Sequence, residues 1–120
     1  MDGLSLFTYR LLDKILDAYF SIFDILEEKI DAIEDEVVRR PDKSTVHSIF
    51  VVKKTLIFFH RALTANREVI TAIEKEYIIN IDKNNIKRFR DLYNDATQLI
   101  DMEGTYRDIL TGTLDIYLSS

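Results

Sequence analysis

Apolar residues recur at alternating intervals of three and four along almost the whole chain of 120 residues. This spacing places them on one face of a helix. Two such series run from Ile49 to Tyr77 and from Phe89 to Tyr117. The longest opens the chain with Leu12, Leu16, Tyr19, Phe23, Leu26, Ile30, Ile33 and Val37. The pattern therefore predicts three long amphipathic helices.

Two breaks separate the three series. Pro41 disfavours helix in the residue before it, so the first helix is expected to end near Arg40. The second break covers residues 78–85, where β-branched residues and asparagines favour a turn. The candidate N-caps of the helices that follow are Asp42, Ser44, Asp82 and Asn84.

The expected helices cover about residues 4–40, 45–77 and 85–118, within a single domain. The short first connection makes the first two helices an antiparallel hairpin. Three glycines and one proline are too few to punctuate a multi-stranded β fold. The sequence thus predicts an all-α fold, an elongated bundle of three long helices with coiled-coil-like packing.

Some positions depart from a single apolar stripe on each helix. A second apolar series widens the face of the first helix and predicts that its N-terminal half is buried on more sides than its C-terminal half. Its members are Leu11, Ile15, Ile22 and Ile25. Asn66, Glu103 and Thr113 are polar entries in the later stripes. We interpret Asn66 as a residue that fixes register or lines a wet gap.

The net charge of −5 makes nucleic acid a poor partner, because an acidic chain repels phosphate. The absence of cysteine excludes disulfides and thiolate metal sites. The N-terminus does not resemble a signal peptide, and no window of about 18 residues is free of charge.

No catalytic motif is present, so we do not expect an enzyme. His47 and His60 lie thirteen residues apart, which does not match a helical metal pair, and both are interpreted as surface or seam residues. The three isolated glycines form no phosphate loop. A carboxylate-bridged di-iron site is disfavoured because its histidine ligands are missing.

Carboxylates are the one group of residues with possible metal chemistry. The acidic residues from Glu27 to Glu36 are interpreted as a solvated helix face. Asp13 and Asp17 lie one turn apart beside the widest apolar face, and Asp91 lies between Phe89 and Leu92. Hard cations such as Mg²⁺ take oxygen ligands of this kind. Asp13, Asp17 and Asp91 are therefore the candidate metal ligands.

Four strings of the sequence resemble the cytoplasmic part of the CorA magnesium and cobalt transporters. They are LLDKILDAYFSIFDILEEKIDAIEDEVVRRPDK, ALTANREVI, FRDLYNDATQLIDMEGTYRDIL and LDIYLSS. The resemblance implies that the first two helices are the antiparallel "willow" hairpin and the third is the stalk. The stalk lacks a helix stop near Ser120, so we expect the chain to be a fragment cut short of the membrane.

The resemblance implies a regulatory part of a pentameric channel for Mg²⁺, with Co²⁺ and Ni²⁺ also carried, at the cytoplasmic face of the membrane. The family's N-terminal α/β domain and membrane helices are not in this sequence. Any contact with the membrane would therefore be made through absent segments. In the family, divalent cations bind between neighbouring subunits and hold the closed state.

Asp91 corresponds to the family's stalk carboxylate, and Asp13 and Asp17 to acidic positions of an adjacent site. The remaining ligands belong to the absent domain, which implies low affinity here. We also expect the stalk stripe to lie exposed in a monomer and to drive self-association. The alternative is a soluble coiled-coil scaffold with no metal role.

Overall fold

The computed structural model describes residues 3–79 and 82–119, except for the side chains of residues 78 and 79. Three helices make up this part: α1 (Gly3–Arg39), α2 (Lys43–Ile79) and α3 (Lys83–Ser119). Each helix end lies within two residues of the expected one. Asn80 and Ile81, which belong to the expected second break, lie outside the described residues. The prediction of an all-α fold is confirmed.

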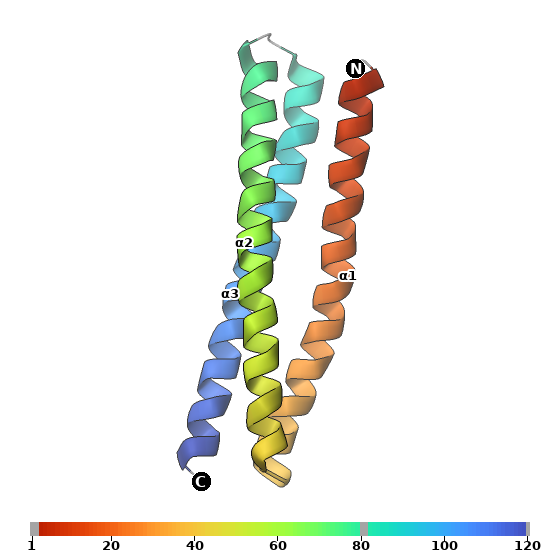
Figure 1. Ribbon diagram of the computed structural model, residues 1–120. Helices are drawn as coiled ribbons and strands as arrows, with labels where there is room; N and C mark the ends of the chain where they lie inside the picture. Colours follow the sequence, from red (N-terminus) through yellow and green to blue (C-terminus); the bar gives the residue numbers. More distant parts are fainter. Residues whose placement is uncertain (1–2, 80–81, 120) are drawn as a thin grey trace.

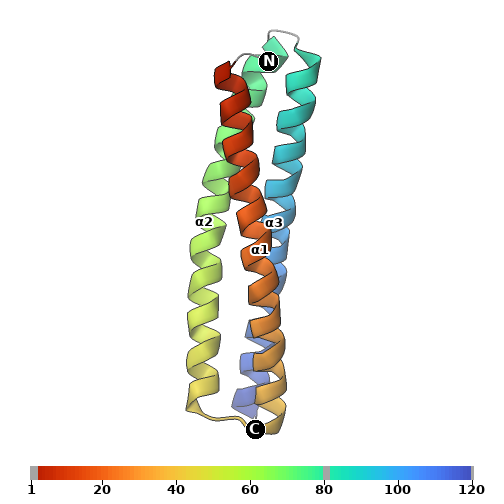
Figure 2. The ribbon, with the colours of Figure 1, turned by 90° about the vertical axis from the view of Figure 1, so that its right-hand side faces the viewer.

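The three helices lie side by side in a rod with extents of 59 × 19 × 17 Å. α1 and α3 run in the same direction and α2 runs against them (Figures 1 and 2). α3 packs against both other helices, whereas α1 and α2 make fewer contacts with each other. The bundle is therefore organised around α3. Within the described residues, no helix is long and apolar enough to cross a membrane.

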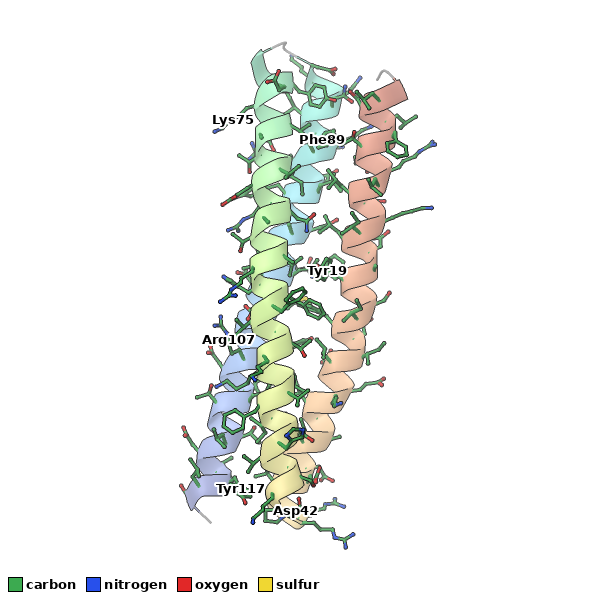
Figure 3. The ribbon with its side chains drawn as sticks, in the orientation of Figure 1. Tyr19, Asp42, Lys75, Phe89, Arg107 and Tyr117 are labelled. Carbon is green, nitrogen blue, oxygen red and sulfur yellow. The ribbon has the colours of Figure 1, made fainter. Side chains whose placement is uncertain are left out.

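The core is one continuous apolar cluster along the axis of the rod. α1 supplies the predicted seam, with Leu16, Phe23 and Ile30 at 2% exposure or less. Aromatic rings fill its middle, where Tyr19 meets Phe59 edge to face at 5.4 Å between ring centroids (Figure 3). Burial of this seam is what holds helices of this length together, because most helical stability comes from packing.

Aspartates cap the two helices that follow the breaks. Asp42 Oδ1 accepts hydrogen bonds from the backbone N–H groups of Ser44 at 2.7 Å and Thr45 at 3.2 Å. A hydrogen bond from the Ser44 hydroxyl, together with these two backbone bonds, holds the pKa of Asp42 below its usual value. Asp82 Oδ1 accepts from the backbone of Asn85 at 3.2 Å. The capping residues are thus Asp42 and Asp82 rather than Ser44 or Asn84.

Two expectations about exposure were wrong. The stripe of α3 is core: Phe89, Leu92 and Leu99 are at most 1% exposed, because α3 packs against both other helices. Most of the second apolar series of α1 is instead exposed, with only Ile15 half-buried, since α1 and α2 make few contacts with each other. Leu11 is 49% exposed and Ile25 is 65% exposed.

The polar entries in the stripes are satisfied locally or across the bundle. Asn66 is half-buried and donates from Nδ2 to the carbonyl of Ala62 at 2.9 Å, within its own helix. Thr113 is buried and donates to the carbonyl of Ile109 at 2.8 Å. Neither residue has a contact that indicates a chemical role.

Candidate metal site and the polar seam

Four carboxylates gather on the α1–α3 side of the bundle. Asp13 and Asp17 come from α1, and Asp91 and Asp95 come from α3. Each pair is one helical turn apart, so its members share a helix face. Burial raises the pKa of Asp95, and the charges of Asp13, Asp17 and Asp91 raise it further. The fold therefore brings the three sequence-predicted carboxylates into one electrostatic neighbourhood.

Asp95 is the member of this group that the sequence did not single out. Its spacing of four from Asp91 was visible in the sequence. The sequence does not show the packing of α3 beside α1, which brings Asp95 into the electrostatic field of Asp13 and Asp17. A half-buried carboxylate among like charges is the group that gains most from a bound cation.

The group is open rather than a closed cage. Asp17 and Asp91 are exposed, while Asp13 and Asp95 are half-buried. Among residues 3–79 and 82–119, no three His, Asp or Glu side chains lie close enough together to hold a metal ion. Mg²⁺ often takes only one or two carboxylates and keeps several of its waters. The donor chemistry suits a hydrated hard cation, and the exposure leaves room for ligands from another molecule.

An aromatic ring and a guanidinium border the group. Tyr9 packs edge to face on Phe89, with ring centroids 5.9 Å apart, and Arg88 lies 5.9 Å from the centroid of the Tyr9 ring. Burial and the Asp13 charge raise the pKa of Tyr9, against the lowering effect of Arg88. The charges of the carboxylates thus act on Tyr9, a residue whose ring packs against the apolar core.

A second polar feature joins α2 to α3. Residues at heptad spacing on α2 each contact a polar residue of α3, which places all four contacts along one seam. The pairs are Lys53 with Thr111, His60 with Glu103, Arg67 with Thr97 and Glu74 with Arg90. Three of the α2 residues, Lys53, Arg67 and Glu74, carry a formal charge. The four contacts together fix which turn of α3 faces which turn of α2.

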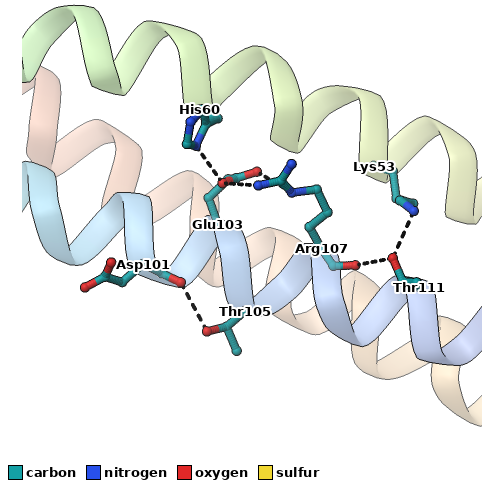
Figure 4. A network of polar contacts seen from close by, with 7 residues as sticks. All are labelled: Lys53, His60, Asp101, Glu103, Thr105, Arg107 and Thr111. Atoms are coloured by element: carbon teal, nitrogen blue, oxygen red, sulfur yellow. Dashed lines mark hydrogen bonds and ion pairs between the residues drawn. The ribbon is translucent and has the colours of Figure 1, made fainter.

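Glu103 is the buried centre of this seam, with a side chain of zero exposure (Figure 4). Its Oε2 lies 3.0 Å from Nδ1 of His60. Arg107 approaches one turn further on, with Nε 3.1 Å from Oε1, although Oε1 takes part in no hydrogen bond among the described residues. His60 and Arg107 both remain partly open to water. The seam position of His60 agrees with its interpretation from sequence.

The family relationship follows from comparison with known proteins. Residues 2–120 match the family described as "CorA-like Mg2+ transporter protein". The chain belongs to this CorA-like family. The resemblance drawn from the four sequence strings is thereby confirmed. The family is one of transporters, which agrees with the lack of catalytic motifs in the sequence.

Relatives in the CorA-like family match nearly the whole chain. The cobalt/magnesium transport protein CorA of Methanocaldococcus jannaschii is 37% identical over 98% of this chain. The protein of the same description from Thermotoga maritima is 36% identical over 93% of it. The chain spans only 37% and 32% of the lengths of these two relatives.

Solved structures give the same result for the fold. The soluble domain of CorA from Methanocaldococcus jannaschii superposes with a TM-score of 0.88 at 37% identity, over 98% of this chain and 47% of that one. The complete CorA magnesium transporter of that organism gives a TM-score of 0.89, over 98% of this chain and 37% of the other. The three-helix rod is therefore the arrangement that these residues take in CorA proteins.

Proposed function

We propose that this chain is the regulatory part of a CorA-like Mg²⁺/Co²⁺ transporter and senses divalent cations through carboxylates between subunits. Membership of the family over residues 2–120 supports the transport role. The feature that supports sensing is the position of Asp13, Asp17 and Asp91, whose charges add to burial in raising the pKa of Asp95. The cation sensed is also the cargo of the transporter, Mg²⁺ or Co²⁺, with Ni²⁺ as a further candidate.

The mechanism is a cation that favours one arrangement of subunits over another. Asp17 and Asp91 are exposed, so an ion held by them can accept further ligands from a neighbouring subunit. When cations are abundant, they neutralise the carboxylates and hold the subunits together. When cations are scarce, the carboxylates repel and the subunits rearrange. A ligand shifts such an equilibrium only by its difference in affinity for the two states.

The proposed setting is a self-associated assembly, the pentamer of the full-length parent, with this part on the cytoplasmic side of the membrane. We propose that α3 transmits cation binding to the channel. It carries Asp91 and Asp95, and it packs against both other helices. Movement of α3 relative to α1 therefore changes the distances between the four carboxylates.

Thermal melting with Mg²⁺ or Co²⁺ tests the proposal. A cation that binds only the folded state raises the melting temperature by mass action. At ten times the dissociation constant the gain is about 1.4 kcal/mol, or roughly 6 °C for a chain of this size. Asp91→Asn and Asp13→Asn should reduce this rise. Asp31→Asn, on the acidic face of α1 further from Asp95, should leave it unchanged.

Two outcomes would count against the proposal. An absence of any shift at millimolar cation would favour the coiled-coil scaffold with no metal role. A shift that Asp31→Asn abolishes as fully as Asp91→Asn would show diffuse attraction to the acidic surface rather than a site.

A further inference from the structure

The buried carboxylate of Glu103 has two partners, and only one of them comes from another helix. Arg107 lies four residues further along α3, with Nε 3.1 Å from Oε1 and a longer hydrogen bond of 3.4 Å to Oε2. His60 reaches the carboxylate from α2, with Nδ1 3.0 Å from Oε2 (Figure 4). Arg107 therefore balances the buried charge within α3, whereas His60 is the partner that ties Glu103 to α2.

The charge of this tie depends on the proton concentration. Imidazole has an ordinary pKa of about 6.5, so a histidine changes charge between pH 5 and 8, whereas a guanidinium stays positive throughout that range. His60 is 43% exposed, so protons reach its ring from water, while the Glu103 side chain has zero exposure. A proton added to His60 thus places a positive charge beside a carboxylate that water does not reach.

The other members of the polar seam keep their charge over the same range. Lys53 and Arg67 lie one heptad before and one heptad after His60, and both donate to threonine hydroxyls of α3. Glu74 accepts a hydrogen bond from the guanidinium of Arg90. His60 is therefore the member of the seam whose charge changes near neutral pH.

The neighbouring charged groups have other surroundings. Arg61, the next residue of α2 after His60, is exposed. Three carboxylates of α1 act on the hydroxyl of Tyr106 in α3, and they are Asp24, Glu27 and Asp31. From α3, the imidazole is faced by Glu103 and, next to it, Arg107.

We propose that His60 and Glu103 form a proton-sensitive tie between α2 and α3. At low pH, the imidazolium donates a charge-assisted hydrogen bond to the carboxylate, which is about twice as strong as a neutral one. At high pH, the neutral ring can only donate its Nδ1–H, so the tie weakens. The positive charge meets the buried carboxylate in the folded state alone. The stability that it adds is therefore present at low pH and is lost as the ring gives up its proton.

The proposal has a consequence for α3. This helix carries Asp91 and Asp95 as well as Glu103, so a proton on His60 changes how firmly α2 holds the helix that bears candidate metal ligands. The tie itself depends only on contacts between α2 and α3. It therefore holds whether or not the carboxylates beside α1 bind cations.

Thermal melting at pH 5.5 and pH 8 tests the proposal with two replacements of His60. His60→Gln keeps a hydrogen-bond donor but never gains a charge, and His60→Arg is charged at both pH values. From pH 8 to pH 5.5, the melting temperature of the parent should rise by about 4 °C relative to that of His60→Gln. The pH response of His60→Arg should equal that of His60→Gln. Other titrating groups, such as Asp95, are common to all three chains and cancel in the comparison.

His47→Gln is the matched control, because His47 is an exposed histidine on the same helix. Its pH response should equal that of the parent. Nitrogen-15 NMR of the parent provides a measurement that needs no variant at position 60. At pH 8 it should find the proton of the His60 ring on Nδ1, the atom that faces Glu103.

Three results would overturn the proposal. The first is an equal pH response of the parent and His60→Gln. The second is a response that His47→Gln removes, which would assign it to the exposed histidine. The third is a ring proton on Nε2 of His60 at pH 8, because a bare Nδ1 cannot donate to the carboxylate of Glu103.

Discussion

Replacement of Glu103 should not destabilise the bundle, although its carboxylate lies at the centre of a polar seam. The side chain has zero exposure, whereas His60 is 43% and Arg107 is 38% exposed. Burial of a carboxylate carries a desolvation penalty of several kcal/mol that an ion pair offsets only partly. Glu103→Met removes that penalty and keeps a similar volume. The two side chains left behind, His60 and Arg107, can reach water.

The magnitude follows from this asymmetry. Apolar replacement of a buried ion pair is neutral or stabilising by about 1–4 kcal/mol, so Glu103→Met should gain between zero and about 2 kcal/mol. Arg107→Met leaves the buried carboxylate with His60 alone and should cost about 3 kcal/mol. For a chain of this size, about 1 kcal/mol shifts the melting temperature by about 4 °C. The two variants should therefore melt more than 10 °C apart.

Thermal and urea unfolding followed by circular dichroism at 222 nm measures both effects. Arg39→Met is the matched control, since Arg39 pairs with Asp35 at the surface, where both side chains are more than 60% exposed. It should change stability by less than about 0.5 kcal/mol. A larger loss for Glu103→Met than for Arg107→Met would refute the reasoning, because it would show that the carboxylate itself stabilises the fold.

Two further predictions concern the pH dependence of stability. Because Asp95 has a raised pKa, the folded chain binds more protons than the unfolded chain between the ordinary value of 3.8 and the raised one, so stability falls as pH rises through that window. Asp95→Asn should therefore be more stable than the parent at neutral pH. Loss of the like-charge pair with Asp91 alone should raise the free energy of unfolding by roughly 0.2–0.5 kcal/mol. This gain should vanish below pH 3.8. A gain that persists there would assign it to packing. Asp42 has a lowered pKa, so its cap contributes stability that is present above 3.8 and is lost as pH falls through the folded value. Asp42→Ala should melt lower than the parent at neutral pH and equally at pH 2, and an equal deficit at both pH values would contradict this role.

The fold was predictable from sequence because one signal dominates it. Heptad spacing from Leu12 to Val37 determines a buried face of α1, and Pro41 sets the turn that follows. No segment showed the alternation of a β-strand, and the few glycine and proline residues also favoured helices. The helix ends were harder to place, since Asp42 and Asp82 each had a neighbour that could cap equally well.

Spacing along one helix could not decide which face meets which neighbour. The exposure of Ile25 and the burial of Leu92 both depend on α3 packing more extensively on α1 and α2 than those two pack on each other, which is a property of three helices together. For the same reason the pairing of His60 with Glu103 was hidden, because the two residues are 43 positions apart in the chain. Asp13, Asp17 and Asp91 were chosen from local spacing and family resemblance, and Asp95 needed the packing of α1 on α3.

Paramagnetic NMR with Co²⁺ is the most direct test of a cation site among the four carboxylates. A bound Co²⁺ shifts and broadens the amide signals of residues near it. We predict that titration affects first the amides around Asp13, Asp17, Asp91 and Asp95, and that excess Mg²⁺ reverses the effect. Broadening centred on the acidic face from Glu27 to Glu36, or no localised effect at millimolar Co²⁺, would contradict a cation-sensing role for this part of the CorA-like chain.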